Sequence, residues 1–291
     1  MKGAIVVNGY YSSPASENQA ARLKEELRKL GAETEIIKND SPFFIGEKFG
    51  YDFAVFFDKD VNLARNMEES GTLVFNSSFA IENTDDKIKT ALILERDKSI
   101  VTPMTVPSPK KYRYFRDDDF LRKIGEKLGY PVVVKEARGS LGEQVYLAEN
   151  FDELVKTDEK TGNTDKLFQQ FVSESRGRSV RVIVVGKKYL CAMLLENAED
   201  FRSNANNGGK GICVDVDETY VKTAEKVAEL FDLDYCGVDF FAVAPIVIEV
   251  NSNAYFETIE KTTGENVALR YAQHIIRTTK EYLECRNSHS L

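Results

Sequence analysis

The sequence is poor in the residues on which several common catalytic sites depend. It has 291 residues but only two histidines and no tryptophan. Two histidines cannot supply a three-histidine metal site. His274 falls in a helical pattern, His289 falls in a polar stretch, and neither lies near a nucleophile motif. A Ser-His-Asp or Cys-His catalytic centre is therefore not predicted.

Cysteines and long apolar runs are scarce as well. The four cysteines (Cys191, Cys213, Cys236, Cys285) show no Cys-x-x-Cys spacing, so we expect reduced thiols rather than disulfides or zinc ligands. No apolar run reaches the roughly 18 residues that span a bilayer. The short apolar run after Met1 is too short for a signal peptide and predicts a first strand. We expect a cytoplasmic protein with no membrane partner.

The charge balance is acidic, with 47 Asp and Glu against 39 Lys and Arg and a net charge of −8. This disfavours general nucleic-acid binding. The hydrophobic share of 42% and charged share of 30% are ordinary for a globular protein. At about 100–200 residues per domain, the length predicts two domains.

The first 85 residues alternate between strand and helix patterns. Buried strands are expected at residues 3–7, 34–37, 53–57 and 72–75, with a helix at 60–70. This order predicts a small parallel sheet with helices on its faces. It contains neither Gly-x-G-x-x-Gly nor a Gly-x-x-x-x-Gly-Lys-Ser/Thr loop.

The rest of the chain mixes strands and helices without a repeat. We expect one helix from Thr84 to about Asp97, a capped helix ending before Gly129, a helix near 218–231 and a final helix near 265–284. Strands are expected at 131–136, 144–148, 166–172, 179–186 and 189–196, with two more flanking Ala244-Pro245.

The segment from Gly237 to Asn251 carries polar residues inside two apolar strands. A short turn between the strands places Asp239 near Glu249, and Asn251 shares a face with Glu249 because they are two residues apart. Three oxygen ligands in an apolar hairpin predict a magnesium site. The alternative is a pair of strand-end carboxylates that face solvent.

Cations that suit a polyphosphate lie elsewhere. Lys135 ends a valine-rich strand just before the glycine turn Gly139-Ser-Leu-Gly142, whose amides can bind phosphate oxygens. Lys87 lies near a helix start, and Arg181 lies within an apolar strand, where it needs an anionic partner. The alternative for Lys135 is a solvated strand end. The alternative for the loop around Arg202 is an ordinary surface loop. Together the pieces predict ATP bound beside magnesium, and phosphoryl transfer.

From about Asp85 to the last helix the sequence resembles the RimK-like glutamate ligases of the ATP-grasp superfamily. The motifs that carry the resemblance are Asp86-Lys87, Tyr130-Pro-Val-Val-Val-Lys135 with Gly139-Ser-Leu-Gly142, Leu167-Phe-Gln-Gln-Phe-Val172, Gly177-Arg-Ser-Val-Arg181, Asp200-Phe-Arg-Ser-Asn204 with Gly208-Gly209, Gly237-Val-Asp239, Glu249-Val-Asn251 and Ile259-Glu-Lys-Thr-Thr-Gly264. Their order along one chain makes the resemblance specific.

The resemblance implies an α/β fold with a parallel-sheet N-terminal pre-ATP-grasp domain followed by a two-lobed ATP-grasp module. We expect the N-terminal domain over residues 1–85 and the ATP-grasp domain over 86–285, with a polar tail at 286–291. The lobe with the lid would cover about 100–170, and the C-terminal lobe about 171–285.

The resemblance also implies the site. Groups that contact ATP would be Lys87, Lys135, the turn residues Gly139, Ser140 and Gly142, the hinge residues Gln170, Phe171 and Val172, and Ser179. Two magnesium or manganese ions would be bound by Asp239, Glu249 and Asn251. Residues that act on the transferring group would be Arg202, Asn204 and Arg181.

The activity implied is an ATP-dependent carboxylate–amine ligase that forms an amide through an acyl-phosphate. It would join an amino acid, with glutamate as the candidate, to a carboxylate of a peptide, protein or small metabolite. Alternatives are a ligase that crosslinks peptide side chains, an amino-acid-biosynthetic ligase, and a non-catalytic ATP-binding regulator. Whether the chain forms a homo-oligomer is open.

Three departures from the family pattern bear on these alternatives. Ser179 stands where the family usually has an aspartate, and Gln144 where a glycine often follows the lid turn. After Asn251, the run Ser-Asn-Ala-Tyr replaces small residues with Pro-Gly, so Ala254 and Tyr255 are expected to reshape the acceptor pocket.

Overall fold

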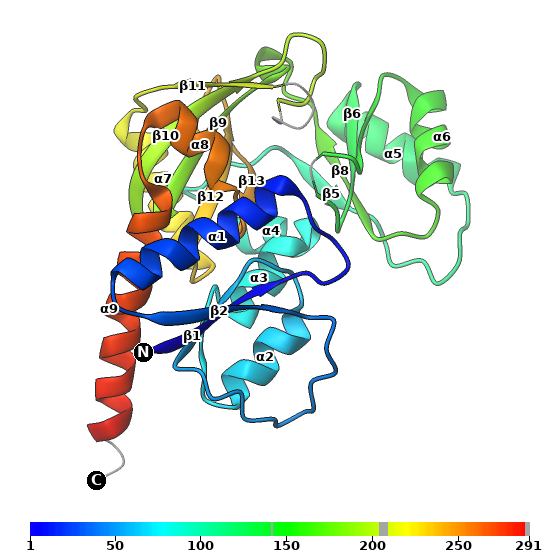
Figure 1. Ribbon diagram of the computed structural model, residues 1–291. Helices are drawn as coiled ribbons and strands as arrows, with labels where there is room; N and C mark the ends of the chain where they lie inside the picture. The colour runs from blue at the N-terminus through cyan, green and yellow to red at the C-terminus, as the bar shows by residue number, and fades with distance from the viewer. Residues whose placement is uncertain (141, 204–208, 289–291) are drawn as a thin grey trace.

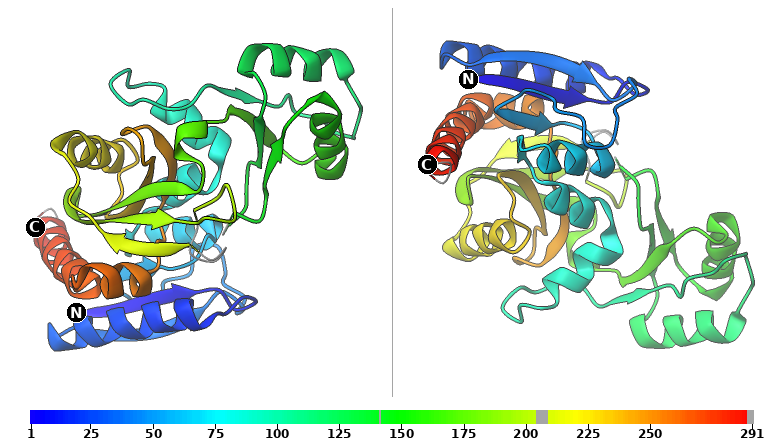
Figure 2. Two further views of the ribbon diagram at one scale, coloured as in Figure 1. Left: turned by 90° about the horizontal axis from the view of Figure 1, so that it is seen from above. Right: turned by 90° about the horizontal axis from the view of Figure 1, so that it is seen from below.

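Three β-sheets and the helices that cover them make up the part of the chain described by the computed structural model, which is residues 1–140, 142–203 and 209–288 (Figure 1). A four-stranded parallel sheet is formed by the N-terminal region. The other two sheets are antiparallel, and the smaller of them stands apart from the N-terminal sheet in all views (Figure 2). The predicted α/β class with a parallel N-terminal sheet is confirmed. No helix among the described residues is long and apolar enough to cross a membrane.

The parallel sheet has the order β2-β1-β3-β4. Its strands are β1 (Lys2–Val7), β2 (Glu33–Lys38), β3 (Phe53–Phe56) and β4 (Leu73–Phe75). Alternation along β1 sends Ile5 to a core beneath α1 (Pro14–Lys29), and Ala4 and Val6 to a core beneath α2 (Val61–Glu69). The prediction that β2 is buried was wrong, because β2 lies at the sheet edge and Ile36 is 41% exposed.

The helix expected from Thr84 to about Asp97 was wrong in its bounds, and the helix that precedes it was not predicted. Helix α3 (Ser78–Asp85) ends and α4 (Lys87–Leu94) begins on either side of Asp86, whose backbone is extended. The Asp86 carboxylate accepts hydrogen bonds from the backbone N–H groups of Ile88 and Lys89 at 2.9 and 3.2 Å. This N-cap interrupts the helix and places Lys87 in the first turn of α4.

A four-stranded antiparallel sheet of order β5-β8-β6-β7 forms the small lobe. Its elements are β5 (Thr105–Pro107), β6 (Val132–Glu136), β7 (Val145–Ala148), β8 (Lys166–Gln170), α5 (Asp118–Leu128) and α6 (Phe151–Thr161). On β6, Val132 and Val134 pack beneath the helices. Since successive side chains alternate, Val133 and Lys135 point to the opposite face, which lines a cavity.

The larger antiparallel sheet has the order β11-β10-β9-β12-β13. Its strands are β9 (Arg178–Val185), β10 (Lys188–Glu196), β11 (Lys210–Cys213), β12 (Tyr235–Phe241) and β13 (Val247–Asn251). A short 3-10 turn, Ser173–Ser175, precedes β9. Helix α7 (Glu218–Leu230) packs on one face, and α8 (Phe256–Thr263) with α9 (Val267–Ser288) covers the other. Helix α8 was not predicted, and α9 extends through part of the expected polar tail.

The two ends of the chain share one core. Residues of β1 and α1, such as Ile5 and Leu23, pack in the same cluster as Tyr271 and Ile275 of α9, and Figure 2 shows α1 and α9 side by side. Asn76, which is 1% exposed, ties the parallel sheet to the large sheet. Its amide donates to the carbonyls of Tyr235 and Ser252 at 2.8 Å each, and its oxygen accepts from the N–H groups of Asp234 and Tyr235 at 2.7 and 3.1 Å.

Candidate active site

Two adjoining cavities lie where the small lobe, the large sheet and the start of α4 meet. The first lies between β6, β8 and β13, and the second lies between β9, β13 and the segment that follows β13. Four residues line both cavities: Lys87, Gly139, Ser140 and Glu249. The cavities therefore meet at a lysine–carboxylate pair beside the glycine turn (residues 139–142).

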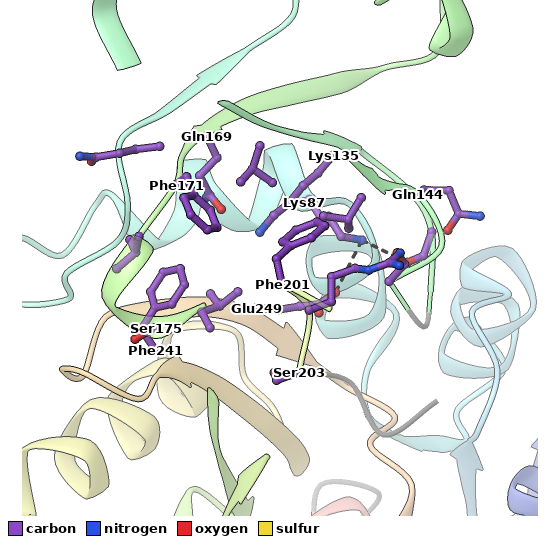
Figure 3. Close-up of a pocket in the computed structure, with 18 of the residues that line it drawn as sticks. Lys87, Lys135, Gln144, Gln169, Phe171, Ser175, Phe201, Ser203, Phe241 and Glu249 are labelled. Atoms are coloured by element: carbon purple, nitrogen blue, oxygen red, sulfur yellow. Dashed lines mark hydrogen bonds and ion pairs between the residues drawn. The ribbon is translucent and has the colours of Figure 1, made fainter. Parts of the chain in front are cut away.

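The first cavity has an aromatic side (Figure 3). Phe171, Phe201 and Phe241 line it, and the rings of Phe171 and Phe201 lie edge to face with centroids 6.4 Å apart. All three residues predicted at the hinge line this cavity, because β8 ends at Gln170 and the chain continues along the cavity wall as Phe171 and Val172. A flat apolar group suits this side.

Two lysines, Lys87 and Lys135, line the same cavity. Lys135 is 9% exposed, and its burial lowers its pKa to about 8 although the Glu249 carboxylate acts to raise it. Lys87 Nζ lies 3.6 Å from Glu249 Oε1. Lys135 and Glu249 thus belong to one cavity, as the sequence analysis requires.

Three cations contact the glycine turn. Lys87 Nζ donates to the carbonyl of Gly139 at 3.1 Å, Arg202 Nη1 donates to the carbonyl of Gly142 at 2.6 Å, and Lys59 Nζ donates to Ser140 Oγ at 3.1 Å. Oxygen atoms of the turn are therefore bound by side chains suited to phosphate oxygens. Leu141 of this turn lies outside the described residues.

Gln144 fixes the conformation of the turn. Its Oε1 accepts a hydrogen bond from the Ser140 N–H at 3.2 Å. A Cβ on Gly139 would lie 2.4 Å from the same oxygen, so a larger residue there would displace the Gln144 side chain. Gly142 has φ of 76°, in the left-handed region. The residue that departs from the family pattern thus takes part in closing the turn.

The acidic hairpin forms with the predicted register. Asp239 pairs with Glu249 across β12 and β13, and Gly237 pairs with Asn251. The walls around Glu249 partly desolvate its carboxylate, which acts to raise its pKa, but Lys87 and Lys135 outweigh this effect and hold the pKa below its usual value. Its side chain keeps 31% exposure toward the cavities. Glu249 is therefore an ionised carboxylate that is accessible from the cavities.

Asp239 is held differently, because both of its oxygens accept from Arg181, each at 2.7 Å. Burial acts to lower the pKa of Arg181, and the Asp239 carboxylate more than offsets it, so the guanidinium stays charged. The Asn251 amide donates to Asp239 Oδ2 at 3.3 Å. The anionic partner that the sequence analysis required for Arg181 is thus a protein carboxylate.

Asp239, Glu249 and Asn251 together offer hard oxygen donors of the kind that Mg²⁺ prefers. Within the described ranges, no group of three or more His, Cys, Asp and Glu side chains has a metal-binding arrangement, and here the third donor is an amide. Donor type therefore fits a divalent cation, with Glu249 open to the cavities and Asp239 paired to Arg181.

The structure locates the other predicted residues as follows. Arg181 and Asn251 line the second cavity. Ser179 is not among the residues that line the first cavity. The Ser179 hydroxyl lies 2.5 Å from the hydroxyl of Ser203, and Ser203 does line the first cavity. Asn204 lies outside the described residues.

Sequence reasoning missed two residues at the site. Lys59, which lines the second cavity, follows the buried strand β3 in the polar run Asp58-Lys59-Asp60 at the carboxyl end of a parallel strand. That position is where ligands of parallel sheets bind and was a usable signal. Phe241 shares a strand face with Asp239, since they are two residues apart.

Comparison with known proteins agrees with this geometry. The family model for the RimK-like ATP-grasp domain matches residues 84–275. A probable alpha-L-glutamate ligase of Psychromonas ingrahamii is 35% identical over 215 residues, which is 71% of this chain and 68% of the relative. The MG012 homolog of Mycoplasma pneumoniae is 30% identical over 280 residues, which is 92% of this chain and 96% of the relative. The crystal structure of D-alanine–D-alanine ligase from Bacillus anthracis has a TM-score of 0.75 at 18% identity, with 99% of each chain covered.

The fold and the site define the class: this protein is an ATP-grasp enzyme, an ATP-dependent ligase. Within that class, the chain belongs to the RimK-like ATP-grasp family. The family predicted from the sequence motifs is thereby confirmed.

Proposed function

We propose that this enzyme joins the amine of an amino acid, with glutamate as the candidate, to a carboxylate of a second molecule at the expense of ATP. The observation that carries the proposal is the junction of the two cavities at Lys87 and Glu249. An aromatic and cationic cavity suits a nucleotide, and the polar cavity beside it gives a carboxylate and an amine access to the terminal phosphate. Relatives named probable alpha-L-glutamate ligases support glutamate as the amino acid.

Each predicted residue has a role under this proposal. Phe171 and the adjoining hinge residues Gln170 and Val172 hold adenine, and Lys135 and Lys87 bind phosphate oxygens. Lys87 and Arg202 now donate to carbonyls of the glycine turn. Phosphate oxygens of ATP would replace these carbonyls as acceptors, and the turn would then cover the phosphates. Ser179 does not reach the first cavity directly, so it would affect the nucleotide through Ser203.

Divalent metal, bound by Glu249, Asp239 and Asn251, would supply charge neutralisation for the phosphates; two ions are expected. Arg181 orients Asp239 through two hydrogen bonds and acts to lower the pKa of this carboxyl, which burial raises above its usual value. Arg202, with Asn204 of the same loop, would neutralise the oxygens of the transferring phosphoryl group.

The reaction balances without a protein nucleophile. A carboxylate oxygen of the acceptor attacks the γ-phosphorus, the bond to the β,γ-bridging oxygen breaks, and ADP leaves. The amine then attacks the carbonyl carbon of the acyl-phosphate, inorganic phosphate leaves with the bonding electron pair, and the amine loses a proton. Positioning and charge neutralisation supply most of the rate gain in such a reaction.

Hydroxylamine trapping tests the proposal directly. The enzyme is incubated with ATP, Mg²⁺, hydroxylamine and a set of carboxylic acids, and hydroxamates and ADP are measured. We expect equal amounts of the two products with at least one acid, because hydroxylamine captures any acyl-phosphate. ATP that binds but yields neither product with any acid would contradict the proposal and favour a non-catalytic regulator.

A further inference from the structure

A third and larger cavity, here called the outer cavity, lies beyond the second one. Its volume is about 610 Å³, and it lies between the carboxyl ends of β1 and β3, the start of α1 and the glycine turn. In the order β2-β1-β3-β4, the chain leaves β1 toward one side of the sheet and later adds β3 on the other. The crevice between such strand ends is where open parallel sheets bind ligands.

The outer cavity opens onto the reaction centre. Four residues line both it and the second cavity: Lys59, Ser140, Asn253 and Tyr255. Lys59 Nζ contacts Ser140 Oγ at 3.1 Å and forms an ion pair with Asp85. A ligand in the outer cavity can therefore extend past Lys59 toward Glu249 and the phosphates.

The segment after β13 that forms this junction is held in place from two sides. The carbonyl of Ala254 accepts from Tyr235 Oη at 2.7 Å and from Gln19 Nε2 at 3.1 Å. Gln19 Nε2 also donates to Asn253 Oδ1 at 3.1 Å. Tyr255, one of the departures from the family pattern, is thereby fixed at the mouth of the outer cavity.

The second cavity and the outer cavity differ in size, so they suit substrates of different length. The second cavity measures about 170 Å³ and the outer cavity about 610 Å³. Pockets of roughly 300–1,000 Å³ hold ligands of drug size. The second cavity suits one amino acid, whereas the outer cavity has room for a chain of several residues.

The lining of the outer cavity does not suit a small polyacid. Its charged residues are three acids and two lysines: Glu17, Asp58, Glu143, Lys38 and Lys59. The Asp58 carboxylate is already bound by Asn8 and Asn39 at 3.0 and 2.6 Å. Two like-charged surfaces repel, and a ligand with several carboxylates would meet more acids than lysines here.

Apolar and aromatic side chains supply much of the remaining wall. They are Val7, Tyr11, Ala20, Ile36, Phe57 and Tyr255. Ile36 is 41% and Tyr11 55% exposed, although both are large apolar groups. Such a wall gains free energy by burying an apolar ligand.

We propose that the acceptor is an extended, peptide-like chain, with one reacting carboxylate at Lys59 and a largely uncharged, apolar body in the outer cavity. This inference rests on the proposed ligase function and names its acceptor class. Free amino acids and small di- and tricarboxylates are then poor acceptors.

Two acceptor pools test the inference. One contains free amino acids and small polycarboxylates. The other contains N-acetylated tri- and tetrapeptides rich in Ala, Val and Phe, with a single free carboxylate. With ATP, Mg²⁺ and hydroxylamine, we expect ADP release and hydroxamate at least about tenfold higher with the peptides. Equal or greater turnover with the small acids would overturn the inference while leaving the ligase function intact. Absence of turnover in both pools would overturn both.

A pair of isoleucine variants tests the location. Ile36→Asp places a charge in the apolar wall, so the KM for the best peptide should rise about tenfold, with a much smaller change in kcat. Ile45→Asp is the matched control, because Ile45 is fully exposed and does not line the outer cavity. An unchanged KM in a folded Ile36→Asp variant, or an equal rise of KM in both variants, would show that the peptide does not bind in the outer cavity.

Discussion

At the scale of single residues, Glu249 is a carboxylate with several cationic side chains nearby. Lys87 lies 3.6 Å from its carboxylate, and Lys135 and Arg181 also act to lower its pKa. It lines both the first and the second cavity. No other carboxylate among the described residues lines both, so we expect its charge to affect both the nucleotide and the acceptor.

Glu249→Gln should therefore reduce ATP turnover by at least about 100-fold, as expected for loss of an electrostatic group at a reaction centre. The amide keeps the shape of the side chain but removes its charge, so the fold should stay intact by circular dichroism. Glu257→Gln is the control, since Glu257 is an acid of α8 that pairs with exposed Lys261. Full activity of Glu249→Gln would exclude a role for this charge in the reaction.

A second prediction at this scale concerns pH. Because burial lowers the pKa of Lys135 to about 8, the side chain loses its charge as pH rises through that value. Phosphate favours the charged form, so ATP affinity should fall from pH 7 to pH 9, and binding near pH 8.5 should take up about three-quarters of a proton.

Calorimetry of ATP binding in two buffers of different ionisation enthalpy measures this proton uptake. Lys135→Arg should bind ATP without it, because the guanidinium keeps its proton in this range. Wild-type protein that binds ATP with no proton uptake near pH 8.5 would show that Lys135 is not the group involved.

Residue types predicted much of the site but not its pairings. Strand periodicity predicted that Glu249 and Asn251 share a face, and the short turn of the hairpin predicted that Asp239 lies opposite Glu249. The bidentate pairing of Arg181 with Asp239 joins residues 58 apart, and no local pattern encodes it. Lys59 was missed although its position after a buried parallel strand was a usable signal, and its contacts with Asp85 and Ser140 join distant segments. The assigned roles of all these residues stay predictions.

At the scale of elements, the conformation of the glycine turn is stabilised by the nearby side chain of Gln144 and by two cations. Gln144 accepts from the Ser140 N–H, and Lys87 and Arg202 bind carbonyls of the turn. Opening the turn breaks these contacts, and phosphate oxygens can replace those made by the two cations.

Removing the Gln144 contact should loosen the turn. In Gln144→Ala, amide hydrogen exchange over residues 138–144 should become several-fold faster without nucleotide, because a hydrogen bond that protects the turn is lost. Bound ATP should restore slow exchange. Gln273→Ala, on the exposed face of α9, is the control. Unchanged exchange in Gln144→Ala would mean that the cations alone hold the turn.

Element types were predicted better than element boundaries and burial. The strands that line the site were all expected, since their apolar runs are short and bounded by turn residues. Helix α3 was missed, and the next helix, expected to start at Thr84, starts three residues later at Lys87, where the Asp86 carboxylate caps it. The edge position of β2 depends on the strand order, which a local pattern does not contain.

At the scale of the whole molecule, the parallel sheet and the large sheet are joined through polar contacts as well as apolar packing. Asn76 satisfies four backbone groups of the segment from Asp234 to Ser252. The segment after β13 contacts α1 through Gln19. The expected division into domains at residue 85 stays a prediction, and the shared core of α1 and α9 crosses it.

Asn76→Ala should lower the free energy of unfolding by about 2–4 kcal/mol, because it leaves buried backbone groups without partners. Asn83→Ala is the control. Asn83 makes one exposed contact with the Phe79 carbonyl in α3, and its replacement should change the same quantity by no more than about 0.5 kcal/mol. Urea unfolding followed by circular dichroism measures both. Equal stability of the two variants would show that Asn76 does not hold the sheets together.

The packing of α9 against α1 has a consequence for biosynthesis. Leu23 and Leu27 of α1 share a cluster with Ile275 of α9, and about 250 residues must be translated between these segments. On the ribosome, the α1 side of the parallel sheet therefore remains without its last covering layer until α9 has emerged from the exit tunnel. A nascent chain arrested before residue 267 would expose that apolar face and would be a natural client for chaperones.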